Sequence, residues 1–205
     1  MACWGWGFGV YLGWGAEDEL FISGKAMTGI IFEPWIGSKY TADNRFDLRV
    51  LVLGESHYGE ESESGATVTS EVVRQYAQDE RHAFFTKVSK VLLGLDEKTW
   101  IDDEARGEVW EHVAFYNYIQ GFVSNESRVR PSTEMWTAAQ DPFLHVLASL
   151  KPNVILVLGK ELIAHLPELP AGIEICGIQH PSTGFDYKKW NPFFSDALQR
   201  TRVNG

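Results

Sequence analysis

The sequence has only two cysteines, Cys3 and Cys176, among its 205 residues. Two cysteines are too few for a disulfide framework or for a four-cysteine zinc or iron–sulfur site. Cys176 lies in an apolar run, which favours a buried hydrophobic side chain over a nucleophile. No apolar run approaches the roughly 20 residues that cross a bilayer, and no secretion signal is evident. We therefore expect a soluble cytoplasmic monomer with no membrane partner.

Basic residues are also in deficit, because 18 lysines and arginines stand against 28 aspartates and glutamates, for a net charge of −10. This balance argues against broad electrostatic capture of nucleic acid. A local basic face is still compatible with it, since several bases fall in the later loops and the last helical segment: Arg128, Arg130, Lys188, Lys189, Arg200 and Arg202. Charge alone supports an acidic surface with scattered bases and a nucleic-acid-binding face equally.

Three common functional signatures are missing. The segment Gly54-Glu55-Ser56-His57-Tyr58 is not a Gly-x-Ser-x-Gly elbow, so the usual serine acyl-transfer arrangement is unsupported. There is also no Gly-x-x-x-x-Gly-Lys-Ser/Thr loop and no Gly-x-Gly-x-x-Gly. These absences exclude the two common nucleotide-phosphate cradles.

What the sequence does contain is a short β-branched apolar run that stops abruptly at a polar turn, LRVLVLGESHYGEE, residues 48–61. Such a run is typical of a buried parallel strand that delivers side chains to a site at its carboxyl end. Three more runs alternate with helical segments, at residues 112–118, 153–158 and 173–178. The pattern predicts a three-layer α/β/α sandwich with a four-stranded parallel sheet.

The segments between these runs predict helices around a single domain, residues 1–205, with residues 1–47 as an extension that packs on a core of residues 48–202. Residues 98–111 form a charged helical segment with Trp100 and Val109 turned inward. Ser132 is placed to cap a helix that runs to about Leu150. Residues 32–37 predict a turn, and Asn191 with Pro192 predicts the start of the last helix. The Gly- and Trp-rich residues 1–15 are assigned no function.

Polar residues stand where each predicted strand ends. Glu55, Ser56 and His57 follow the first, Asn117 ends the second, and His180 follows the fourth. The carboxyl ends of parallel strands meet at one edge of the sheet, so we expect one shared crevice. With nearby aromatic side chains, this set suits a planar ring that is read by hydrogen bonds and stacking.

Five motifs in this order resemble the uracil-DNA glycosylase superfamily. They are Gly54-Glu55-Ser56-His57-Tyr58, Phe115-Tyr116-Asn117, Arg130-Pro131-Ser132-Thr133-Glu134 with Pro142-Phe143-Leu144, Leu156-Val157-Leu158-Gly159 and Gln179-His180-Pro181-Ser182. Each motif is weak alone, and the order over residues 48–202 carries the resemblance. It implies a DNA glycosylase that hydrolyses the N-glycosidic bond of uracil or another modified or damaged base after base flipping.

The resemblance also implies roles for individual residues. His180 corresponds to the histidine that stabilises the departing base anion, and Glu55 or His57 would activate water because Ser56 stands at the usual position of that group. The implied base-binding residues are Gly54, Ser56, Tyr58, Phe84, Phe85 and Asn117. The implied DNA-binding residues are Ser182, Thr183, Gly184, Phe185, Lys188 and Lys189, with Phe185 as the apolar wedge. No lysine lies within the motifs, so the implied enzyme is monofunctional, with no metal or organic cofactor.

Two other classes remain open. Gly54-Glu55-Ser56-His57-Tyr58-Gly59 also resembles the opening motif of erythromycin-esterase-like hydrolases, in which Glu55 and His57 would carry the reaction and the spacing to Glu60 could hold a metal. That alternative does not explain Asn117 or His180. A nucleic-acid-binding protein that keeps the glycosylase pocket without catalysis is the third class, and it accords with Ser56. The excised base and the choice between repair and defence are not determined by the sequence.

Overall fold

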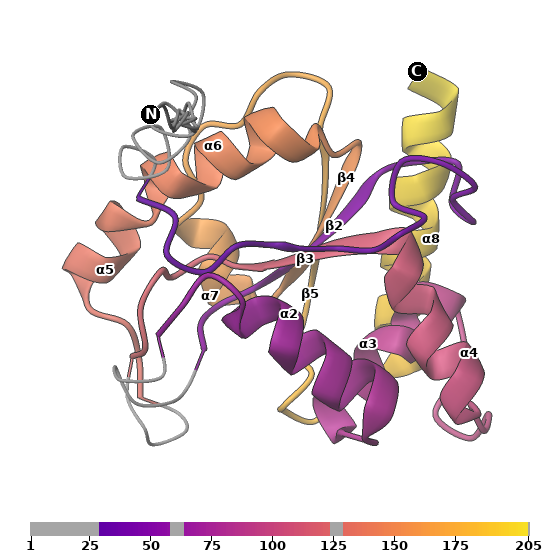
Figure 1. Cartoon of the computed structure of the whole chain (residues 1–205). Coiled ribbons are helices and arrows are strands. Elements are labelled where there is room, and N and C mark those ends of the chain that lie inside the picture. Colours follow the sequence, from indigo (N-terminus) through magenta and orange to yellow (C-terminus); the bar gives the residue numbers. More distant parts are fainter. Residues whose placement is uncertain (1–28, 58–63, 124–128, 205) are drawn as a thin grey trace, which may run out of the picture.

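The computed structural model describes residues 29–57, 64–123 and 129–204, whose path is shown in Figure 1. The strands are β1 (Trp35–Ile36), β2 (Val50–Gly54), β3 (Val113–Asn117), β4 (Val154–Leu158) and β5 (Glu174–Ile178). The helices are α2 (Val68–Val73), the π-helix η2 (Arg74–Asp79), α3 (Ala83–Leu93), α4 (Asp103–Glu108), the 3-10 helix η3 (Val109–His112), α5 (Thr133–Ala138), α6 (Gln140–Leu150), α7 (Lys160–Ala164) and α8 (Tyr187–Asn204). Of the predicted extension, residues 29–47 are described, and they bury Phe32, Tyr40 and Phe46 in the core.

The strands form one mixed sheet in the order β1-β3-β2-β4-β5. The four predicted strands are present and parallel to one another. The prediction of a four-stranded parallel sheet is nevertheless wrong, because β1 adds a fifth, antiparallel strand that pairs Trp35 with Phe115. The sequence predicts a turn for residues 32–37, because the two paired residues lie between Pro34 and Gly37 and are too few to show the alternation of a strand.

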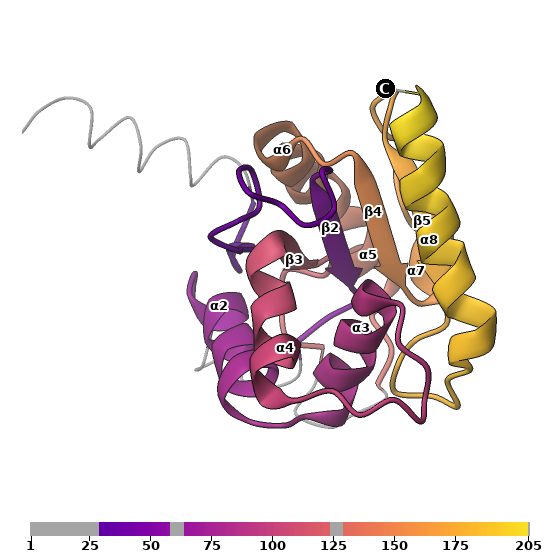
Figure 2. The ribbon, with the colours of Figure 1, turned by 90° about the vertical axis from the view of Figure 1, so that its right-hand side faces the viewer.

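Helices cover both faces of the sheet (Figures 1 and 2). The helices α2, α3 and α8 pack on the face to which Val50 and Val52 point. The helices α5, α6 and α7 pack on the face to which Leu51 and Leu53 point. Because both faces are buried, β2 reads as a continuous apolar run instead of an alternating one. Within the described ranges, no helix combines the length and the hydropathy that a bilayer crossing requires.

The helix ends agree in part with the sequence predictions. Ser132 caps α5 as predicted, its hydroxyl accepting the Met135 N–H at 3.3 Å. The predicted start of the last helix is wrong, because α8 begins at Tyr187 and Pro192 lies inside it. The carboxylate of Asp186 accepts the main-chain N–H of Lys188 at 3.0 Å, which satisfies a donor at the helix start five residues earlier than Asn191 would.

The two inward-facing residues expected in residues 98–111 behave differently. Val109 is buried as predicted, but the expectation for Trp100 is wrong, because its side chain is 76% exposed. The Arg81 guanidinium lies 4.4 Å from the Trp100 ring centroid, so a cation–π contact holds this ring at the surface. The helix that would have turned it inward begins only at Asp103.

Buried Arg106 of α4 ties together the helices that pack against β3. Its side chain is fully buried, and its guanidinium donates to the main-chain oxygens of Ala77 at 2.5 Å, Glu80 at 2.7 Å and Gln78 at 3.2 Å. These are the carbonyls at the end of η2, which lack partners of their own once the helix stops. The Arg106 carbonyl in turn accepts the Ser89 hydroxyl at 3.1 Å. The Arg106 side chain therefore fixes α4 against η2, and its carbonyl oxygen joins α4 to α3.

We expect Arg106→Met to lower the free energy of unfolding by about 3 kcal/mol, because it removes charge-assisted hydrogen bonds and leaves buried carbonyls unpaired. Urea denaturation measures the loss. Arg200→Met is the matched control, since Arg200 is exposed and pairs with Glu174. The control should cost less than about 1 kcal/mol. Equal losses in the two variants would contradict the role of Arg106.

Candidate functional site

The carboxyl ends of the parallel strands meet at one edge of the sheet, where Gly54 of β2 pairs in register with Asn117 of β3. The chain continues this pairing beyond the strands, since Tyr118 N–H donates to the Gly54 oxygen at 3.0 Å and Ile119 N–H donates to the Glu55 oxygen at 2.9 Å. The two strand ends are therefore held together by backbone bonds. Side chains that leave them have fixed positions.

Gly54 makes room for the Asn117 side chain. A Cβ atom built on Gly54 would lie 2.1 Å from Asn117 Oδ1, which no real side chain tolerates. Asn117 is 5% exposed. The register with Gly54 fixes its place at the strand edge.

His180 is held in one neutral form. Its Nδ1 accepts the Ser182 N–H at 3.2 Å, so the proton of the neutral ring lies on Nε2. Burial lowers the pKa of His180, and the positive charges of Arg130 and Lys87 lower it further. Near neutral pH the ring is therefore uncharged and presents an Nε2–H donor. Gly159, whose φ of +133° favours glycine, lies beside this ring, and a Cβ atom on it would be 3.8 Å from His180 Cδ2, an ordinary contact.

Of the two aromatic candidates, only Phe84 belongs to this edge. Its ring centroid lies 5.5 Å from that of His180 at a tilt of 39°. The Phe85 ring is in edge contact with the Phe84 ring at 5.2 Å and packs deeper in the core, 5.1 Å from Trp110 and 6.0 Å from Phe115 between ring centroids. The structure therefore separates the predicted pair into one ring at the site and one ring of the core.

The loop after His180 is bridged by its own polar groups. The Gln179 amide donates to Thr183 Oγ1 and to the Gly184 oxygen, each at 2.8 Å. Ser182, Thr183 and Gly184 are exposed. Phe185, the predicted wedge, is half-buried against the core and in edge contact with Tyr187 at 5.1 Å. A wedge role thus requires Phe185 to leave this packing.

Lysines surround this loop. Lys87 Nζ donates to the Pro181 oxygen at 2.7 Å. The predicted DNA contacts Lys188 and Lys189 are exposed in the first turn of α8, and Lys189 Nζ lies 4.8 Å from the Trp190 ring centroid. Lys160 Nζ lies 5.4 Å from the same ring. The acidic chain therefore carries a local cluster of cations beside His180.

Glu55 lies in a second cluster, built around Arg130. The Arg130 Nη1 atom lies 3.2 and 3.3 Å from the two Glu55 carboxylate oxygens and 3.0 Å from Glu161 Oε2. Burial raises the pKa of Glu55, the Arg130 charge opposes this rise, and the Glu161 charge adds to it. Arg130 was recognised in the sequence only as part of a motif. It lies in a loop that no helical or strand pattern places next to Glu55.

His57 does not join either cluster. It is 5% exposed, its Nε2 lies 3.1 Å from Thr69 Oγ1, and its ring meets Phe32 edge-on at 5.1 Å. Burial lowers its pKa to about 4. Glu55 bonds to Arg130 and His57 to Thr69, so the two residues named by the esterase-like alternative have different partners. The predicted catalytic residue His57 has the contacts of a core residue.

The remaining candidates are placed as follows. Ser56 Oγ is buried without a hydrogen-bond partner in the described part of the chain. Tyr58 and Glu60 lie outside the described residues. Among residues that are described, no three His, Cys, Asp or Glu side chains gather as a metal site would need. Cys176 is buried and burial raises the pKa of its thiol to about 12, as its predicted role as a core residue requires.

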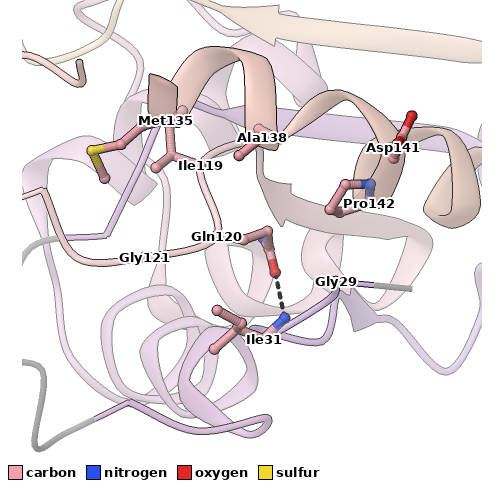
Figure 3. Close-up of a pocket in the computed structure, with 10 residues that line it drawn as sticks. Gly29, Ile31, Ile119, Gln120, Gly121, Met135, Ala138, Asp141 and Pro142 are labelled. Atoms are coloured by element: carbon pink, nitrogen blue, oxygen red, sulfur yellow. Dashed lines mark hydrogen bonds between the residues drawn. The ribbon is translucent and has the colours of Figure 1, made fainter. Parts of the chain in front are cut away.

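A cavity of about 430 Å³ is lined by Gly29 and Ile31, by residues 119–121 after β3, and by residues of α5 and α6. No local sequence pattern indicates it, because its walls come from distant segments. Figure 3 shows Gln120 in its wall, reaching toward Ile31. Gln120 Oε1 accepts the Ile31 and Phe32 N–H groups at 2.9 Å, and its Nε2 donates to the Asn117 main-chain oxygen at 2.8 Å. Gln120 thus links the Asn117 main chain to the segment that contains Ile31 and Phe32.

The neutral state of buried His57 predicts a pH dependence of stability. In the unfolded chain its pKa returns to about 6.5, so between pH 6.5 and 4 the unfolded state binds more protons. The stabilisation is complete above pH 6.5 and is lost as the pH falls toward 4. From pH 7 to pH 5 the wild type should lose about 2 kcal/mol more than His57→Gln in urea denaturation.

His145→Gln is the control for this comparison, because His145 is exposed on α6. It should keep the pH dependence of the wild type. If His57→Gln also keeps it, His57 is not buried in the neutral form.

No protein-family profile matches this chain, and a search of curated proteins finds no significant match. The likeness to uracil-DNA glycosylases therefore consists of the five motifs and their order. Any functional conclusion has to be argued from the geometry at the strand edge.

Proposed function

We propose that the chain is a monofunctional DNA glycosylase, which hydrolyses the N-glycosidic bond of uracil or another modified or damaged base after the base has left the duplex. The observation that carries the proposal is the Asn117 side chain, which is buried at the strand edge in the space that Gly54 leaves open. The neutral His180 ring, with Nε2–H as donor, supports it at the end of a strand of the same sheet.

The recognition step follows from the groups at this edge. An asparagine amide donates and accepts side by side, which matches the alternating donors and acceptors on the edge of a nucleobase. The Phe84 ring next to His180 offers an apolar face on which the base can stack. Gly54 leaves the space that lets Asn117 adopt this position.

The chemical step needs opposite charges to be stabilised. As the N-glycosidic bond breaks, its electron pair leaves with the base, and positive charge develops on the sugar. The His180 Nε2–H then donates to the base oxygen on which the negative charge collects. Glu55 accepts a proton from the water whose oxygen bonds to the sugar C1′. The departing base anion takes up a proton from solvent, and Glu55 returns its proton to solvent, which restores the enzyme.

The binding of DNA is supported by the cations beside His180. Lys87 of α3 donates to the oxygen of Pro181, the residue after His180, Arg130 lies in a loop, and Lys188 and Lys189 lie in the first turn of α8, whereas the chain as a whole is acidic. A local positive field of this kind attracts the phosphate backbone without broad nucleic-acid binding.

The first test measures base release from single- and double-stranded oligonucleotides that carry uracil, hypoxanthine, xanthine, or oxidised or hydroxymethylated pyrimidines. We expect wild type to release at least one base. His180→Gln should slow the release about 10²- to 10³-fold, because it removes the donor to the base anion. Asn117→Ala should slow it by a similar factor.

His145→Gln, which changes an exposed histidine on α6, should release the base at the wild-type rate. If folded wild type binds DNA but releases no base, the glycosylase proposal is wrong, and the chain is the nucleic-acid-binding protein without catalysis. Release that survives both site substitutions would contradict the assigned site.

The two adjacent phenylalanines predict different defects. Phe84→Ala should weaken binding of the modified strand by about 1–3 kcal/mol, the contribution of one base stacked on one ring, and leave stability nearly unchanged. Phe85→Ala should instead cost about 3–5 kcal/mol of unfolding free energy, because Phe85 is 4% exposed. Fluorescence anisotropy and urea denaturation measure the two effects. A stability loss in Phe84→Ala with normal DNA binding would exclude the stacking role.

A further inference from the structure

The Arg130 guanidinium contacts one of the two groups to which the proposed function assigns chemistry, and its charge acts on the other. It lies 3.2 and 3.3 Å from the two carboxylate oxygens of Glu55. Burial lowers the pKa of His180, and the charges of Arg130 and Lys87 lower it further. Arg130 itself is 63% exposed, and only its Nη1 atom is used in the contacts with the glutamates.

A single cation acts on an acid and on a base in the same direction. Positive charge stabilises the ionised carboxylate and destabilises the protonated imidazole, so both groups release their protons at lower pH. The proposed reaction needs this combination, because Glu55 must be ionised to accept a proton and His180 must be neutral to occupy its Nε2–H tautomer.

Glu161 opposes part of this effect. Its carboxylate lies 3.0 Å from the same Nη1 atom, and it shares the Arg130 charge with Glu55. Glu161 is on α7 and exposed, whereas Glu55 is 9% exposed. His165, at the end of α7, is the other charged or titratable group that faces Glu55, and its positive form also favours the ionised carboxylate.

We propose that Arg130, in contact with both carboxylate oxygens of Glu55, is the positioning residue that favours the ionised form of Glu55, and that Glu161, on the same Nη1 atom, sets how much of the Arg130 charge reaches Glu55. This inference rests on the proposed function for its purpose. The effect of Arg130 on the pKa values concerns the free protein and does not depend on any substrate.

Nuclear magnetic resonance titration of the free protein measures directly how Arg130 affects the pKa values of Glu55 and His180. The ¹³C signal of the Glu55 carboxyl, assigned with Glu55→Gln, and the ring signals of His180 report the two pKa values. In Arg130→Gln both pKa values should rise, and Arg130→Lys, which keeps the charge, should restore both in part. In Glu161→Gln the pKa of Glu55 should fall. Arg200→Gln, which breaks an exposed ion pair with Glu174 on another surface, should change neither.

The pH profile of base release tests whether this effect of Arg130 serves catalysis. In Arg130→Gln the rise of activity with pH should move to higher pH, with on the order of a tenfold loss near pH 6 that recovers at higher pH. A uniform loss at every pH would show a structural role and overturn the inference. Unchanged titrations of Glu55 and His180 in Arg130→Gln would also overturn it, whether or not the protein releases bases. Shifted titrations in a protein that releases no base would support the inference and contradict only the glycosylase function.

Discussion

The register between β2 and β3 is the constraint on which the rest of the candidate site depends. It sets Gly54 opposite Asn117, and the missing Cβ of Gly54 is what lets the asparagine amide occupy the strand edge. The register is in turn fixed by burial on both faces, because shifting β2 by one residue would exchange its two sets of apolar side chains between the faces. A packed core thus determines where one amide lies.

Electrostatics provides the second layer of organisation. The groups at this edge lie partly out of water. Burial raises the pKa of Glu55, which disfavours the ionised form that hydrolysis needs, and lowers that of His180, which favours the neutral form. The Arg130 charge opposes burial at the carboxyl and reinforces it at the imidazole. A site with a cation at this point can use both residues at neutral pH.

Much of the fold was predictable from sequence, because buried parallel strands have a local signature. The four parallel strands, the cap at Ser132, and the positions of Asn117 and His180 at strand ends all follow from short runs of residues. The antiparallel strand β1 was missed, since two residues beside Pro34 carry no periodic signal. The start of α8 was misplaced, since Asp186 offers a cap as good as Asn191 does.

The site was less predictable, because its contacts join distant segments. Nothing local in the sequence tells that Arg130 bonds to Glu55, 75 residues away, or that His57 turns toward Thr69 and Phe32 instead of the strand edge. The choice between Phe84 and Phe85 likewise depends on which side of α3 faces the core. A one-residue step around a helix decides between a core ring and a site ring.

The most direct test of the account is the state of the His180 ring, observed by ¹⁵N nuclear magnetic resonance at pH 7 in free protein and during titration with an oligonucleotide that carries the excised base. The account predicts a neutral ring with its proton on Nε2, and an Nε2–H signal that moves when the oligonucleotide is added. A protonated ring, a proton on Nδ1, or an Nε2–H signal whose position does not change with any modified oligonucleotide would contradict the account.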